Sequence, residues 1–114
     1  MKTGALLEWF ATILGLSVLN GFAEELLFRG LLLIPLVGLL GSNRGNWFQA
    51  AFFGFHHWGA SPDIIAGLPM AIILTLLGVL FGKSVLATRG ISWAIVFHIF
   101  LDIASLSSYL PLGH

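Results

Sequence analysis

Two glutamates and an arginine stand inside an otherwise apolar stretch of this chain. Glu24, Glu25 and Arg29 lie between Phe22 and Gly30, where every other residue is apolar. Ionisable side chains are expensive to hold in such surroundings, so they usually serve a function. On a helix, Glu25 and Arg29 pair on one face, while Glu24 points about 100° away. Arg29 can then neutralise one carboxylate and leave the other as a general base or acid.

A structural interpretation of these three charges stays open. Glu24, Glu25 and Arg29 could form a polar clamp that holds helices together. Buried ion pairs seldom add net stability, and charges inside membranes more often mark a functional site. The pattern therefore favours chemistry over a clamp.

Two adjacent histidines, His56 and His57, lie in an aromatic segment, Phe52–Trp58. Neighbouring residues on a helix point in different directions, so only one histidine is expected to face a site. Gly54 in the same segment allows another backbone to approach closely. A histidine among aromatic residues can equally be a packed, hydrogen-bonded core residue, and this alternative stays open.

A third polar pair, His98 and Asp102, lies four residues apart in another apolar stretch. On a helix the two side chains share a face, where the aspartate can orient the imidazole or help it to hold a ligand or water. One such pair is a weak signal. Three polar clusters on three separate apolar helices are a stronger one, because they can converge inside a helix bundle.

The composition indicates an integral membrane protein. Of 114 residues, 58% are hydrophobic and 9% are charged, and the mean hydropathy is +0.99, whereas roughly a quarter of the residues in a soluble domain are charged. The net charge is zero with five Lys plus Arg, which argues against a nucleic-acid partner. The absence of cysteine excludes disulfides and thiolate catalysis.

Charged residues and helix breakers predict an all-α, polytopic transmembrane bundle of about four to five helices in a single domain, residues 1–114. Asn20-Gly21 is expected to break the first apolar run, and Pro35 to kink the second helix. The predicted helices cover residues 5–20, 22–40, 46–59, 64–82 and 91–110.

The alternation of these helices places the basic residues on one side, which the positive-inside rule makes cytoplasmic: Lys2, Arg44, Lys83 and Arg89. The Asn20 turn and the carboxyl terminus fall on the other side. This arrangement puts Glu24 and His57 near the opposite side of the membrane from the start of the last helix, so tilt or partial spans would have to bring them level with His98.

Taken together, the motifs Glu24-Glu25-x-x-x-Arg29, Phe53-x-x-x-His57 and His98-x-x-x-Asp102 resemble the CPBP family of intramembrane proteases, also called the Abi or CAAX-protease family. The resemblance covers about residues 15–105. It implies an endopeptidase that cuts membrane-associated substrates, either prenylated CAAX proteins or bacteriocin-like peptides. Family members commonly have additional helices, so the chain is expected to be a minimal or truncated member.

The resemblance also implies roles for individual residues. Glu24 would activate water, and His57 would hold the same water. Glu25 and Arg29 would support and orient the base.

His98 and Asp102 would stabilise the oxyanion or complete the site. The last motif of the CAAX-processing branch usually ends in Asn, which can donate a hydrogen bond, whereas ionised Asp102 can only accept one. Asp102 is therefore expected to be protonated, to orient His98 or to bind a metal.

Metal use stays open in the sequence. Zinc accepts nitrogen and oxygen ligands, and a plausible set of four consists of Glu24, His57, His98 and Asp102. The favoured interpretation needs no cofactor, because Glu24 as a metal ligand could not also be a free base.

Two other classes of function compete with hydrolysis. The first is a non-catalytic membrane protein that binds a partner, such as an immunity factor against a bacteriocin. The second is a proton-coupled carrier, which the lack of an internal repeat disfavours. The expected location is a cell membrane crossed several times, most simply a prokaryotic plasma membrane.

Overall fold

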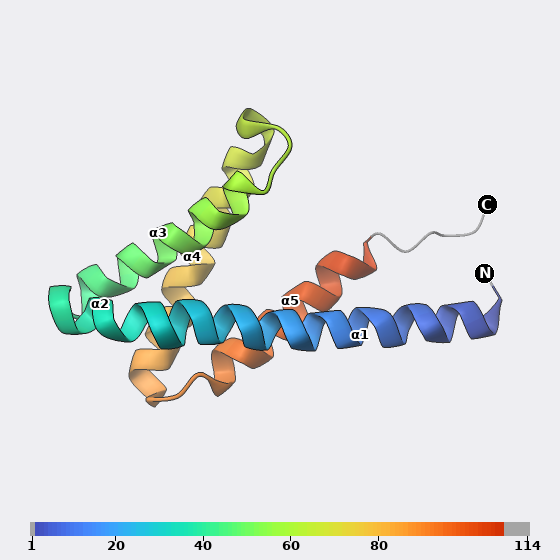
Figure 1. Cartoon of the computed structure of the whole chain (residues 1–114), viewed down its shortest axis with the longest axis horizontal. Helices are drawn as coiled ribbons and strands as arrows, with labels where there is room; N and C mark the ends of the chain where they lie inside the picture. The colour runs from blue at the N-terminus through green and yellow to red at the C-terminus, as the bar shows by residue number, and fades with distance from the viewer. Residues whose placement is uncertain (1, 109–114) are drawn as a thin grey trace.

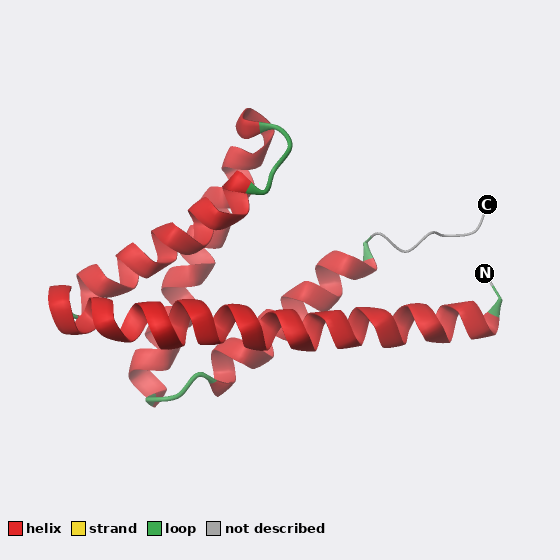
Figure 2. Ribbon diagram, viewed as in Figure 1, coloured by secondary structure: helices red, strands yellow, loops and turns green. Residues whose placement is uncertain are grey.

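The computed structural model describes residues 2–108, and these residues contain only helices and short connections (Figure 2). The all-helical prediction is therefore confirmed. The described part of the molecule is thin and elongated, with extents of 53, 33 and 16 Å. Its helices pack most extensively as α3 against α4, followed by α2 against α3 and α1 against α5.

The first feature of the fold is one continuous helical rod (Figure 1). The rod consists of α1 (Thr3–Glu25), a π-helical segment η1 (Leu26–Leu32) and α2 (Leu33–Leu40). These segments have 23, 7 and 8 residues, and the rod runs along the longest dimension of the molecule (Figure 1). The rod therefore replaces two of the five predicted helices.

The predicted helix break at Asn20-Gly21 is wrong. Both residues lie inside α1, where Gly21 is buried against Ile99 of α5 and the Asn20 side chain donates to Asp102. Tertiary contacts with α5 therefore override the weak helix propensity of the two residues. Gly21 therefore lets α1 and α5 approach closely, and Asn20 makes a hydrogen bond between the two helices.

Continuity of the rod also corrects the predicted topology. Lys2 precedes the rod and Arg44 follows it, so the turn that was predicted to bring these two residues to one side is absent from the rod. Glu24 lies near the middle of the rod rather than near a membrane-facing turn. The depth mismatch between Glu24 and His98 was thus a consequence of the wrong helix boundary.

The π-helical segment ends shortly before Pro35. Proline has no backbone N–H, so Pro35 cannot donate to the carbonyl of Leu31, four residues earlier. A π-helical turn shifts the pairing to five residues and lets the rod continue past this position. Pro35 lies in the first turn of α2, and the wide turn before it takes the place of the predicted kink.

Helices α3 (Ser42–Gly59) and α4 (Ile64–Thr88) pack closely side by side. Gly41, with φ of 87°, makes the turn that leads from the rod into α3. Two buried amides connect α3 to α4: Asn46 donates to the carbonyl of Val79, and Gln49 to that of Gly78. Such hydrogen bonds hold helices together where the surroundings are apolar.

The remaining predicted boundaries agree closely with the structure. α3 begins four residues earlier than expected, and α4 continues from the predicted end at residue 82 to Thr88. The last helix, α5, spans Ser92–Ser107, and residues 109 and 110 of its predicted range lie outside the described residues. Among the described helices, α4 is long and apolar enough to cross a membrane, and α5 is apolar but shorter.

Close packing of α3 on α4 depends on Gly54. A Cβ atom at this position would lie 2.6 Å from the carbonyl oxygen of Ala71, closer than real contacts allow. We expect Gly54→Ala to lower the free energy of unfolding by about 1 to 3 kcal/mol, because the helices must move apart. Thermal unfolding in detergent measures this, with Gly15→Ala as the control, since a Cβ there meets nothing within 4 Å. Equal effects of both substitutions would contradict the packing argument.

Candidate active site

The three polar motifs converge where the rod crosses the other helices. Glu24 and Glu25 end α1, Arg29 lies in η1, His57 lies near the end of α3, and His98 and Asp102 lie on α5. The predicted convergence is therefore present in the structure, and α4 contributes the aromatic ring of Phe81 beside His98.

Glu25 and Arg29 form a fully buried ion pair. Arg29 Nη1 lies 3.1 Å from Glu25 Oε1, and neither side chain is accessible to solvent. The guanidinium also lies over the rings of Phe53 and Phe81, at 4.3 and 5.1 Å from their centroids. Cation–π contacts of this kind are strongest where water is excluded. The pair on one helical face that the spacing predicted is thus present, and aromatic rings from α3 and α4 enclose it.

His98 joins this buried pair from α5. Its Nδ1 lies 2.6 Å from Glu25 Oε1, a buried hydrogen bond between groups 73 residues apart in sequence. A carboxylate accepts, so Nδ1 of His98 donates. A histidine held through one nitrogen presents the other in a fixed direction. For His98 that other nitrogen, Nε2, points toward Glu24.

Glu24 differs from its neighbour in its surroundings. Its Oε2 lies 3.2 Å from Nε2 of His98 and 3.6 Å from Nε2 of His57, and its side chain retains 16% exposure. Among the described residues, Oε2 has no hydrogen-bond partner of good geometry. The two adjacent glutamates therefore divide into one buried in an ion pair and one that faces two imidazoles.

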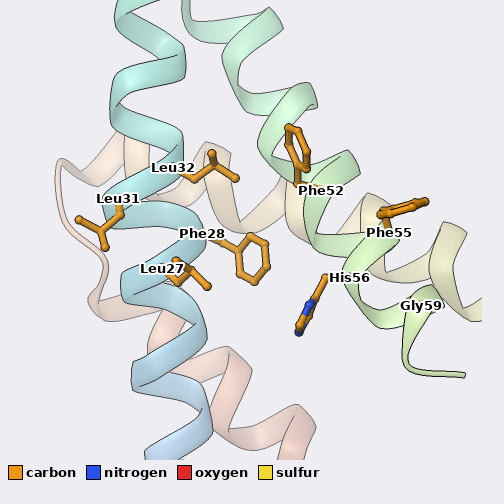
Figure 3. Close-up of a pocket in the computed structure, with 8 residues that line it drawn as sticks. All are labelled: Leu27, Phe28, Leu31, Leu32, Phe52, Phe55, His56 and Gly59. Carbon is orange, nitrogen blue, oxygen red and sulfur yellow. The ribbon is translucent and has the colours of Figure 1, made fainter.

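The two adjacent histidines point in different directions, as the helical spacing predicted. His57 Nδ1 lies 2.8 Å from the carbonyl oxygen of Phe53. A carbonyl can only accept, so Nδ1 carries the hydrogen, and Nε2 of a neutral ring presents its lone pair toward Glu24. His56 instead lines an apolar groove between η1 and α3, beside Phe28 (Figure 3).

Asp102 contacts the cluster on its other side. Its Oδ1 lies 3.5 Å from His98 Nε2, and its Oδ2 accepts a hydrogen bond of 2.8 Å from Asn20. Asn20 is thus a site residue, although the sequence predicted it to be part of a turn. One signal was available: Asn20 is a polar residue in an apolar run, four residues before Glu24, and so on the same side of a helix.

A cleft of about 430 Å³ lies against the cluster. Its polar part consists of His57, His98, Asp102 and Ser105. Most of its apolar wall comes from α4. Binding clefts for organic ligands usually combine an apolar lining with a few polar groups. The two histidines that line the cleft, His57 and His98, are the same two that contact Glu24.

The donor set suits a metal chemically, because two imidazole nitrogens and two carboxylates are ligands that zinc accepts. Within residues 2–108, however, no three His, Asp or Glu side chains are grouped in the geometry of a metal centre.

The fold and the site together define a helical protein with a carboxylate–imidazole cluster between apolar helices. Residues 6–104 match the family described as type II CAAX prenyl endopeptidase Rce1-like. The chain belongs to this family of proteases, which is membrane-associated, and the resemblance seen in the three motifs is thereby confirmed. Searches of curated proteins and of solved structures found no match.

The buried pair gives a direct stability prediction. We expect Arg29→Met to cost about 3 to 5 kcal/mol of unfolding free energy, because Glu25 stays buried without its cation. Chemical unfolding in detergent measures the loss. The control is Arg44→Met, since Arg44 is exposed on α3. Adding Glu25→Gln to Arg29→Met should recover part of the loss, and no recovery would show that the two charges do not act as a pair.

Proposed function

We propose that this protein is an intramembrane endopeptidase in which Glu24 activates water. The supporting observation is the contrast between the two glutamates. Glu25 is fully buried and bound to Arg29 and His98, whereas Glu24 keeps partial exposure and faces Nε2 of two histidines. A general base must lie within reach of water, and of the two carboxylates it is Glu24 whose side chain keeps exposed surface.

The hydrolytic step follows from these positions. A water held between Glu24 and Nε2 of His57 gives its proton to Glu24 while its oxygen attacks the carbonyl carbon of the substrate. His57 can accept a hydrogen bond from that water, since its own hydrogen is on Nδ1. Glu24 then passes the proton to the amide nitrogen as the C–N bond breaks, which yields a carboxylic acid and an amine. The proton left on the acid passes to the amine, so the released products are a carboxylate and an ammonium group.

His98 is the proposed donor to the oxyanion. Both of its nitrogens face carboxylates, at 2.6 Å from Glu25, 3.2 Å from Glu24 and 3.5 Å from Asp102, so both are placed to carry hydrogen. A donor fixed in advance where negative charge develops lowers the barrier to acyl transfer. Asp102, whose other oxygen accepts from Asn20, orients His98 in this proposal and is not itself the donor.

The proposed substrate is a membrane-associated peptide, either the carboxyl-terminal segment of a prenylated CAAX protein or a bacteriocin-like peptide. The apolar wall of the cleft supports a substrate held at membrane depth. The proposed setting is a cell membrane that the chain crosses several times, most simply a prokaryotic plasma membrane. Substrate and lipid bilayer are then the partners of the protein.

Cleavage of a farnesylated CAAX peptide by purified protein in lipid tests the proposal. We expect release of the carboxyl-terminal tripeptide by wild type and a loss of about 100-fold or more in Glu24→Gln, because the general base is removed. Glu8→Gln is the matched control, since Glu8 is an exposed glutamate on the same helix. The thermal stability of Glu24→Gln should equal or exceed that of wild type, because a catalytic carboxylate kept in apolar surroundings lowers the stability of the fold.

Two results would overturn this assignment. A loss of stability of about 1 to 3 kcal/mol in Glu24→Gln would identify Glu24 as part of a structural clamp. Absence of cleavage of both farnesylated and unprenylated membrane peptides by wild type would favour the rival class, a non-catalytic immunity or partner-binding protein.

Direct catalysis by Glu24 also makes a prediction about metals. We expect cleavage to be unchanged by a zinc chelator, and the purified active protein to contain far less than one zinc per chain, because Glu24 must stay free to accept a proton. Metal analysis and chelator titration of the same preparation measure this. Loss of activity on chelation and its return with zinc would instead make Glu24 and the two site histidines metal ligands.

A further inference from the structure

A second hollow lies on the opposite side of Asp102 from the cleft. Its volume is about 280 Å³, and it lies between α1 and α5, lined by Leu16, Asn20, Asp102, Ser105 and Leu106. The two helices cross near Gly21, and their ends toward the chain termini then separate (Figure 1). The hollow occupies the start of this separation, next to the catalytic cluster.

Asp102 and Ser105 belong to both spaces. Each lines the hollow on one side and the substrate cleft on the other. Polar contacts lead inward from the hollow: Asn20 to Asp102 at 2.8 Å, Asp102 to His98 at 3.5 Å, and His98 to Glu24 at 3.2 Å. Polar groups are thus continuous from the hollow to the proposed base, through Asp102 and His98, which also line the cleft.

Polar residues also continue outward from the hollow along both helices. At the end of α5, the C-cap residue Ser108 follows Ser105 by three residues, and both are exposed. On α1, Thr12 and Glu8 precede Leu16 at intervals of four and are exposed as well. Residues at these intervals share a helical face, so polar groups recur on both helices toward their outer ends.

Hydrolysis needs a water path that the bound substrate does not block. A peptide in the cleft excludes water from that side, and the apolar walls offer water no hydrogen bonds. A water molecule inside a protein needs about two to four polar groups to hydrogen-bond with, in place of the hydrogen bonds it makes in bulk water. The α1–α5 hollow supplies such groups in Asn20, Asp102 and Ser105, and Asn20 does not line the cleft.

We propose that the α1–α5 hollow is the route by which hydrolytic water reaches Glu24, separate from the substrate cleft. Water enters between Leu16 and Ser105, is held by Asn20 and Asp102, and passes His98 to reach the base. The proposal rests on the proposed hydrolytic function, but the accessibility of the hollow can be measured without any activity.

Cysteine labelling tests the route in the intact chain, which has no cysteine of its own. Single variants Leu16→Cys in the hollow, Ile73→Cys in the cleft and Leu19→Cys on the exposed surface of α1 are placed in liposomes. A charged, membrane-impermeant methanethiosulfonate is then added on both sides. The thiolate is the reactive form and forms only where water reaches it. Leu19 is 70% exposed but lines neither space.

We expect Leu16→Cys to react about tenfold faster than Leu19→Cys, because water fills the hollow and lipid covers the rest of α1. A non-cleavable farnesylated peptide should protect Ile73→Cys and leave Leu16→Cys reactive. Equal slow labelling of Leu16→Cys and Leu19→Cys would overturn the route, and so would equal protection of Leu16→Cys and Ile73→Cys by the peptide.

A kinetic measurement connects the hollow to turnover. Leu16→Trp, which fills the hollow, should lower kcat about tenfold with little change in KM, because substrate binding uses the other space. Leu19→Trp is the matched control and should keep both constants. An unchanged kcat in Leu16→Trp would overturn the route. Failure of wild type to cleave any peptide would instead defeat the proposed function, and the labelling pattern would remain a separate result.

Discussion

The buried ion pair of Glu25 and Arg29 is the constraint on which the rest of the described structure depends. A charge removed from water without a partner costs several kcal/mol, so the fold must supply Glu25 with a cation and a second donor. Arg29 provides the cation from the next turn of the rod, and His98 provides the donor from α5. Phe53 and Phe81 cover the guanidinium from α3 and α4. One charged pair therefore fixes the relative positions of all the helices that form the site.

This constraint also explains why two adjacent glutamates can differ in role. Rotation by about 100° per residue turns Glu24 away from the ion pair when Glu25 enters it. Glu24 is then left facing Nε2 of His57 and His98, and the same hydrogen bond that satisfies Glu25 sets the direction of the His98 ring. Glu25 thus takes part in the buried ion pair, and its neighbour Glu24 carries the proposed chemistry. The ion pair positions Glu24.

Much of the candidate site could be predicted from the sequence, because its parts are local. Helical periodicity accounts for the pairing of Glu25 with Arg29, the different directions of His56 and His57 and the shared face of His98 and Asp102. The predicted break at Asn20-Gly21 was wrong, because local propensity is weak compared with tertiary contacts. The wrong boundary then moved Glu24 to a helix end and produced an apparent mismatch in depth.

The sequence alone determined the all-helical class, the membership of the family and the residues that could do chemistry, since these depend on composition and on spacing within single helices. Only the tertiary structure decided that α1 continues through Gly21, that Asn20 bonds to Asp102 across 82 residues and that His98 donates to Glu25 and not to Asp102 through Nδ1. Each of these choices depends on which face of one helix meets another. Helical periodicity defines the faces, but the packing of buried charges and small residues selects among them.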